Sequence, residues 1–255
     1  RAGRAGEMNL FDDSVGRLRT FLERKQSAGE LRTTQLPATT GWPAGERGNI
    51  VLAADTSVEL GNPRVESASF MVWTEAADAV RDGAVHVVGP DLAESAGRSL
   101  PFGKAVILRV NGMNEENCYE RHRALELIRY RLNLKGYMMR AVSQYLREWS
   151  RVSVEAIDGG FSFATLAGTL HSMYRAVEYV SAVEFVFVTS SPDDVRALGE
   201  TGARVERLIG AMNKMAQEMS FDCGVCDYTD VCSEVEDLRS MRKNAAGGGA
   251  HATRH

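Results

Sequence analysis

The chain has 255 residues, of which 44% are hydrophobic and 25% charged, with a formal net charge of −4. This composition is typical of a globular protein, and the charge gives no general attraction to nucleic acid or to an anionic membrane. The longest apolar stretch, VEYVSAVEFVFV, contains Glu178 and Glu184 and is too short to span a bilayer. We therefore expect no nucleic-acid or membrane partner. Because the N-terminus lacks the apolar segment of a secretory signal, we expect a cytoplasmic protein.

Residues 1–48 are predicted to form a helix and a linker ahead of the main domain. Residues 9–25 place apolar side chains at helical spacing. Residues 27–48 contain two prolines and several glycines and threonines, which is typical of a linker or extended arm. We expect this N-terminal helical arm to be the natural docking element for a partner subunit.

Residues 49–220 are predicted to form an α/β or α+β domain. Four runs, NIVLAAD, ASFMVW, AVHVVG and KAVILRVNG, are rich in β-branched and aromatic residues and predict strands. The last run is continuously apolar, so we expect it to be buried on both faces. Residues 115–147 predict a long helix broken at Gly136, and residues 154–161 predict a turn. Helices at 163–177 and 191–219 flank a strand at 182–190. This order predicts one compact domain in which a mixed sheet has flanking helices.

The segment FDCGVCDYTDVC, residues 221–232, contains Cys223, Cys226 and Cys232. A CxxC pair directs two sulfurs to one metal, and a nearby third cysteine can reach the same metal. Thiolates select iron–sulfur clusters or zinc. Residues 221–243 are therefore predicted to bind metal, with an iron–sulfur cluster favoured over zinc and over free thiols. Three thiolates are one short of a closed site. The candidates for the fourth ligand are Asp222, Asp227, Asp230, Cys118 and a group from a partner chain.

Two further segments have unusual composition. Residues 120–151 are rich in arginine, and arginine clusters bind phosphate groups bidentately, so an anionic cofactor such as coenzyme A would fit. On the residues alone, a solvated helix face is the favoured alternative. Residues 244–255 are rich in glycine and alanine, and we expect them to be disordered.

Several segments, taken in order, resemble the β subunit of the carbon-monoxide dehydrogenase/acetyl-CoA synthase complex. VELGNP (Val58–Pro63) resembles the family's VELGGP, and VRDGAVHVVGPDL (Val80–Leu92) resembles its DGxVxVIGPDL element. LPFGKAVILRVNGMN (Leu100–Asn114), ERHRALELIRY and WSRVS followed by GGF resemble its PFAxxVxVxG, LERRxHxFINY and WIRIS segments. The cysteine segment resembles CTLCQSFAPNHVC, which opens the family's metal-cluster site. The resemblance covers roughly residues 50–235.

The resemblance implies a [4Fe–4S] cluster at Cys223, Cys226 and Cys232. It also implies a coenzyme A or acyl-CoA contact at Arg121, Arg123 and Arg151, and other enzyme-complex subunits as partners. Two departures limit it: no cysteine stands near Met241–Arg242, where the family has its fourth cluster ligand, and the nickel-binding Cys-Gly-Cys pair would lie beyond this chain. Nickel and full acetyl-CoA synthase activity are therefore not expected of this chain alone. A fragment of a longer protein and a non-catalytic structural or interaction subunit, with zinc or an empty cysteine site, remain as alternatives.

Overall fold

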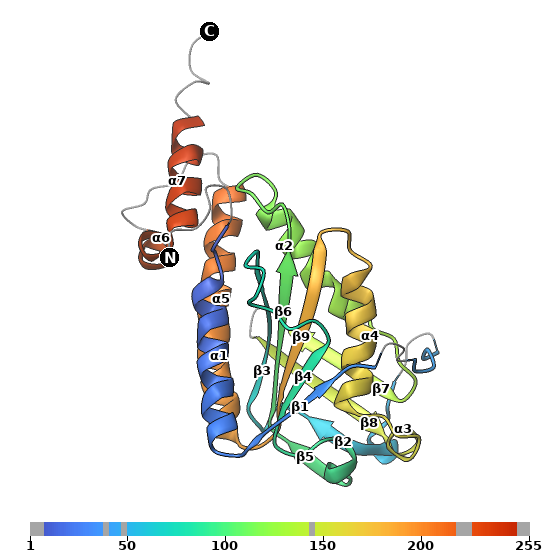
Figure 1. The fold of residues 1–255 in the computed structure, drawn as a ribbon. Helices are drawn as coiled ribbons and strands as arrows, with labels where there is room; N and C mark the ends of the chain where they lie inside the picture. The colour runs from blue at the N-terminus through green and yellow to red at the C-terminus, as the bar shows by residue number, and fades with distance from the viewer. Residues whose placement is uncertain (1–7, 38–40, 47–49, 143–145, 218–225, 249–255) are drawn as a thin grey trace.

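The computed structural model describes residues 8–37, 41–46, 50–142, 146–217 and 226–248. At its centre is a five-stranded mixed sheet with the strand order β1-β4-β9-β6-β3 (Figure 1). Pairing is antiparallel for β1–β4 and β9–β6 and parallel for β4–β9 and β6–β3. The strands are β1 (Leu31–Gln35), β3 (Ser67–Thr74), β4 (Ala84–Val88), β6 (Phe102–Val110) and β9 (Val180–Val188). The central strands β6 and β9 are buried almost throughout, as the continuous apolar runs predict.

A second, four-stranded sheet has the order β5-β2-β8-β7. Its strands are β2 (Thr56–Leu60), β5 (Arg98–Leu100), β7 (Tyr137–Val142) and β8 (Arg147–Ser153). The two sheets meet where β3 runs beside β8. There the Ser69 backbone N–H donates to the Leu146 carbonyl at 2.7 Å, and the Ser67 hydroxyl donates to the Glu148 carbonyl at 2.7 Å. These bonds fix the smaller sheet against one edge of the larger one.

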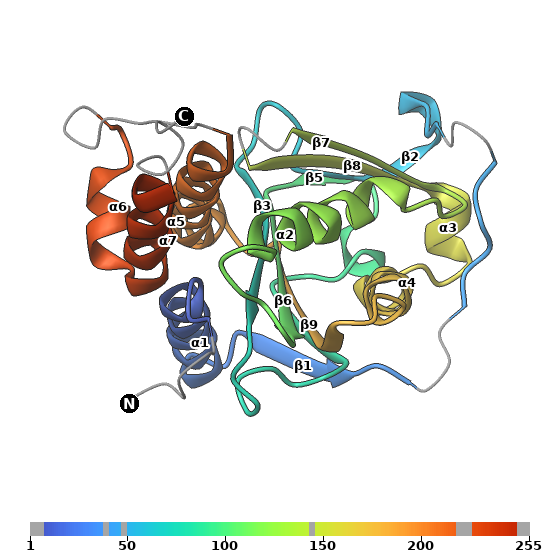
Figure 2. The same cartoon turned by 90° about the horizontal axis from the view of Figure 1, so that it is seen from above.

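Helices cover both faces of the five-stranded sheet (Figure 2). Helices α1 (Asp12–Ser27) and α5 (Pro192–Gln217) lie on one face, and α4 (Phe163–Arg175) lies on the other. On the α4 side, the rings of Phe163 and Phe187 stack with centroids 4.6 Å apart. On the α5 side, a side chain at Gly103 would meet the Leu198 methyl at 2.7 Å, so glycine permits the close approach of helix and strand. The core therefore lies on both faces of this sheet.

The remaining helices are short or lie at the periphery. They are α2 (Cys118–Glu126), α3 (Val154–Asp158), α6 (Thr229–Glu234) and α7 (Glu236–Gly248), with 3-10 turns η1 (Ala53–Asp55), η2 (Ala93–Ser95) and η3 (Leu127–Arg131). Helices α6 and α7 pack on the C-terminal part of α5, apart from the sheets (Figures 1 and 2). Leu238 and Met241 of α7 are buried there. No helix among the described residues is long and apolar enough to cross a membrane.

The fold class is confirmed: the protein is a mixed α/β domain with helices flanking its sheets. The helices predicted at 9–25, 163–177 and 191–219 and the strand at 182–190 form close to the expected positions. Ser191 caps the N-terminus of α5, because its hydroxyl accepts the Asp194 backbone N–H at 3.2 Å.

Three segments differ in detail from their expected local structure. Part of the expected linker is the edge strand β1, whose side chains are mostly exposed, so its sequence carries no hydrophobic signal. The described part of the run NIVLAAD, residues 50–55, forms no strand, and the strand begins at Thr56 instead. Residues 244–248 of the expected disordered tail continue helix α7, while residues 249–255 lie outside the described residues.

The predicted long helix at 115–147 is also wrong, because only α2 and η3 form before the chain becomes strands β7 and β8. In β8, Glu148, Ser150 and Val152 face the core, so two of the three buried side chains are polar and the usual strand alternation is hidden. Glu148 is stabilised there by an ion pair with Lys104 of β6 and by the Ser69 hydroxyl at 2.9 Å. Strand β8 can therefore bury Glu148 because Lys104 and Ser69, from other strands, pair with its carboxylate.

Candidate metal centre

Cys226 and Cys232 line one small hollow beside the C-terminal part of α5. Its volume is about 20 Å³, and its walls come from α5, α6, α7 and the turn before α6. The lining residues are Ala211, Lys214, Met215, Cys226, Tyr228, Thr229, Cys232 and Arg242. Cys226 is partly exposed and Cys232 is buried. The structure thus brings two of the three predicted metal ligands together, while Cys223 lies outside the described residues.

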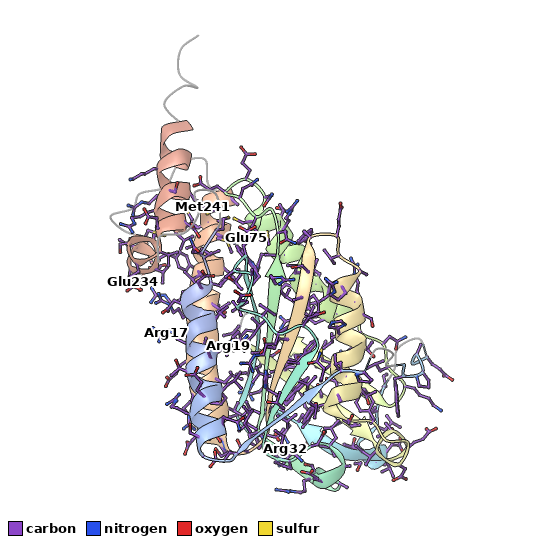
Figure 3. The ribbon with its side chains drawn as sticks, viewed as in Figure 1. Arg17, Arg19, Arg32, Glu75, Glu234 and Met241 are labelled. Carbon is purple, nitrogen blue, oxygen red and sulfur yellow. The ribbon has the colours of Figure 1, made fainter. Side chains whose placement is uncertain are left out.

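Contacts between α5 and α6 hold these two cysteines in place. Arg207 of α5 donates to the Asp227 carbonyl at 3.0 Å and to the Asp230 carboxylate at 2.5 Å. Arg204 donates to Glu234, labelled in Figure 3, at 2.9 Å. A side chain at Gly210 would meet the Tyr228 hydroxyl at 2.7 Å, so glycine is needed for Tyr228 to pack on α5. Both ends of α6 are therefore anchored.

The turn that carries Cys226 is closed by local hydrogen bonds. The Cys226 carbonyl accepts the Thr229 hydroxyl at 2.9 Å and the Thr229 backbone N–H at 3.2 Å. The Cys232 backbone N–H donates to the Tyr228 carbonyl at 3.0 Å within α6. The segment between Cys226 and Cys232 is thus a turn followed directly by helix α6.

None of the candidates for a fourth ligand that the structure describes lines this hollow. Asp230 is paired with Arg207, and Asp227 is exposed and does not line the hollow. Cys118 is buried in α2 with its sulfur 3.9 Å from the Met212 sulfur, and burial raises the pKa of its thiol to about 11. Asp222 lies outside the described residues. Among the described residues, no three His, Cys, Asp or Glu side chains are grouped to hold a metal ion.

The two described cysteines are of the donor type that a thiolate-bound metal requires. Cys226 and Cys232 line the same hollow, and soft thiolate ligands select iron–sulfur clusters or zinc over hard cations. The charged residues in the lining are both cations, Lys214 and Arg242. Sequence analysis missed these two residues because they are separated along the chain, and only the packing of α7 on α5 brings them beside the cysteines.

The three arginines predicted to contact coenzyme A do not share one hollow. Arg151 of β8 lies in a surface hollow of about 240 Å³ with Glu59 and Arg98. Its guanidinium donates to Glu59 at 3.0 Å and lies 4.7 Å from the centre of the Trp149 ring. Burial raises the pKa of Glu59, but hydrogen bonds from Asn62, Arg151 and Trp149 outweigh burial and lower it. Much of the charge of Arg151 is therefore neutralised within the protein.

Arg121 and Arg123 are on helix α2 and do not line the hollow around Arg151. The guanidinium of Arg121 donates to the Gly112 carbonyl at 2.7 Å and stacks over the Tyr179 ring at 4.6 Å. Arg123 is exposed. The geometry gives Arg121 a structural role in joining α2 to the loop after β6, whereas Arg123 remains accessible to a ligand.

Comparison with known proteins supports the family resemblance that the sequence motifs indicate. The family model for the CO dehydrogenase/acetyl-CoA synthase complex beta subunit matches residues 42–195. The chain is 33% identical over 210 residues to the acetyl-CoA decarbonylase/synthase complex subunit beta of Methanothermobacter thermautotrophicus. That match covers 77% of this chain and 42% of the relative, so the chain spans less than half of the relative's length.

Proposed function

Because the chain belongs to the family of the CO dehydrogenase/acetyl-CoA synthase complex beta subunit, we propose that it is an acetyl-CoA-synthase-like subunit of such a complex. The family match over residues 42–195 carries this proposal, and it includes the four-stranded sheet and every strand of the five-stranded sheet except β1. Its partners would be other subunits of the enzyme complex, as the name of the relative indicates for that protein. Activity as a complete synthase is not proposed for this chain alone.

The cysteine segment would hold an iron–sulfur cluster, [4Fe–4S] being the form that the family resemblance implies. Cys226 and Cys232 would supply two thiolates from the hollow beside α5, and Cys223 the third. Such a cluster supplies one-electron redox chemistry and, at an iron without a cysteine ligand, Lewis acidity. The observation that supports this assignment is that Cys226 and Cys232 line the same hollow.

Anaerobic purification followed by analysis of iron, acid-labile sulfide and zinc tests this proposal. We expect iron and sulfide in the wild-type chain and their loss in Cys226→Ser and Cys232→Ser. Cys118→Ala is the matched control, because Cys118 does not line the hollow and should leave the iron content unchanged. A wild-type protein that binds no iron under these conditions would refute the iron–sulfur assignment.

Zinc in a non-catalytic interaction subunit is the second candidate, and the same donor set favours it. Thiolates bind zinc in structural sites, where binding contributes directly to folding. Here the analysis would return one zinc per chain without sulfide. Chelation would then lower the melting temperature of the wild type but not that of Cys226→Ser.

Coenzyme A or acyl-CoA binding is proposed for the arginine-rich part of the chain. Calorimetric titration with coenzyme A would compare the wild type with Arg123→Gln and Arg151→Gln. Because Arg123 is exposed and Arg151 is paired with Glu59, we expect the larger loss of affinity in Arg123→Gln. Equal affinity in all three proteins would exclude these arginines from the binding site.

A further inference from the structure

Strand β1 is one edge of the five-stranded sheet, and no described element pairs with its outer side. Its inner side pairs antiparallel with β4 along its whole length, from Leu31 opposite Val88 to Gln35 opposite Ala84. Leu31 is partly buried, and the other side chains of the strand are exposed. An edge strand presents unpaired backbone N–H and C=O groups, so it is a template for pairing with another chain.

The pairing with β4 decides which residues of β1 present these groups. The Leu36 backbone N–H donates to the Gly83 carbonyl at 2.8 Å, directly after the strand. In an antiparallel pair, hydrogen-bonded positions recur at every second residue. The backbone groups of Thr34 and Arg32 are therefore directed to β4, and those of the intervening residues are directed to the free edge.

Leu31, Thr33 and Gln35 consequently direct their backbone N–H and C=O groups outward. At the positions between hydrogen-bonded pairs, the side chains of opposite residues are close to each other. The Thr33 hydroxyl accordingly lies 2.8 Å from the His86 Nδ1 atom, which supports this assignment. Among the described residues, no hydrogen bond from another element reaches the outward backbone groups.

Features that commonly protect an edge strand are absent from β1. The strand contains no lysine or proline, and its register with β4 has no bulge. Arg32 is its one charged residue, and its side chain, labelled in Figure 3, is held by Glu94 and by the Gly89 carbonyl at 2.8 Å. The strand is therefore close to neutral, and the threonines at its centre favour β structure.

Charge and backbone matching select one register for pairing between two copies of β1. Copies related by a two-fold axis run antiparallel, and the registers that overlap most of the strand are centred on Arg32, Thr33 or Thr34. With Arg32 at the axis, two guanidinium groups would face each other, which is destabilising. With Thr34 at the axis, Pro37 would stand opposite Leu31 without an N–H to donate. With Thr33 at the axis, the whole strand pairs, threonine faces threonine, and Arg32 faces Thr34 of the other copy.

We propose that β1 is a dimerisation surface through which two copies of this chain pair, with Thr33 on the two-fold axis. The five-stranded sheets of both copies then form one continuous sheet. A second copy is the occupant because β1 is complementary to itself in this register and its one charge is already neutralised. No residue of β1 lines the cysteine hollow or the hollow around Arg151, so the dimer is independent of metal and coenzyme A. Such short strands bury a small area, so the dimer dissociates on dilution.

Analytical ultracentrifugation of the full chain in reducing buffer, over a series of protein concentrations, tests the proposal. We expect the wild type to shift from the 27.9 kDa monomer to twice that mass as the concentration rises. Thr33→Pro removes an N–H from the free edge but none from the ladder with β4, so it should stay folded and monomeric. Thr33→Val is the matched control: it loses the hydroxyl but keeps the N–H, and it should dimerise like the wild type.

Oxidative cross-linking, followed by mass spectrometry of the linked peptides, tests the register. Across the axis, the Cα atoms of residue 33 in Thr33→Cys would be about 5.5 Å apart, within the range of a disulfide. In Thr34→Cys, the two Cα atoms of residue 34 would be diagonal neighbours about 7–8 Å apart, beyond that range. We expect a linkage between two copies in Thr33→Cys and little or none in Thr34→Cys.

A wild type that remains monomeric at every concentration overturns the proposal, and so does a folded Thr33→Pro that dimerises like the wild type. Circular dichroism and the melting temperature establish whether Thr33→Pro is folded. If it is not folded, the cysteine variants decide the question. Linkage confined to Thr33→Cys then supports the β1 dimer, whereas equal linkage in both cysteine variants, or linkage in neither, overturns it.

Discussion

Replacing Glu184 by glutamine should reveal how a buried carboxylate joins α1 to the central sheet. Glu184 of β9 is fully buried, and its carboxylate accepts hydrogen bonds from the Arg19 side chain at 2.6 Å, the His86 ring at 2.7 Å and the Arg81 backbone N–H at 2.7 Å. Arg19 of α1 is labelled in Figure 3. Glu184→Gln keeps the shape of the side chain and removes its charge.

The magnitude follows from the pKa of the Glu184 carboxyl. Burial by itself raises this pKa, but the hydrogen bonds from Arg19, His86 and Arg81 outweigh burial and lower it from 4.5 to about 2. This difference corresponds to about 3 kcal/mol of folding free energy. Because the pKa is lower in the folded state, this stability is fully present above about pH 4.5 and is lost as the pH falls through about 2.

Urea unfolding of the wild type and Glu184→Gln, measured at several pH values from 7 to 3, checks this prediction. We expect the variant to be less stable by about 3 kcal/mol at pH 7, and the difference to fall by about half at pH 3. Glu178→Gln, an exposed glutamate before the same strand, should show almost no difference. A difference for Glu184→Gln that stays constant with pH, or that is below about 1 kcal/mol at pH 7, would refute the reasoning.

Three further predictions concern other parts of the fold. Lys104→Met leaves the buried Glu148 without its ion-pair partner and should lower the free energy of unfolding in urea by about 3–5 kcal/mol. Adding Glu148→Gln should restore part of that stability, and additive losses in the double variant would contradict the coupling. Iodoacetamide at pH 8 should label the partly exposed Cys226 of the metal-free chain much faster than Cys118, as measured by mass spectrometry. The reason is that burial raises the pKa of the Cys118 thiol to about 11, and equal labelling rates would contradict its burial. Gly89→Ala should lower the melting temperature more than Gly97→Ala. Both glycines have positive φ, but only at Gly89 would a Cβ lie 2.4 Å from a backbone nitrogen. Equal decreases in melting temperature would show that the loop at Gly89 relaxes.

The sequence by itself determined the elements whose residues carry their own signal. The apolar runs of β6 and β9 and the amphipathic spacing of α1 and α5 are local properties, so they predict the central sheet and its covering helices. The clustered cysteines likewise indicate metal chemistry without any knowledge of the fold. The ordered motifs led to the family, and the family model confirmed it.

Tertiary structure decided the elements and contacts whose partners are distant in the chain. Strand β8 buries Glu148 because Lys104 and Ser69 approach it from the other sheet, and no local pattern indicates that pairing. Strand β1 exists because the exposed edge of β4 offers unpaired backbone groups. Arg242 meets the cysteine hollow only because Leu238 and Met241 bury one side of α7 near α5. In each case the stabilising group comes from another element, so its position follows from packing and not from sequence spacing.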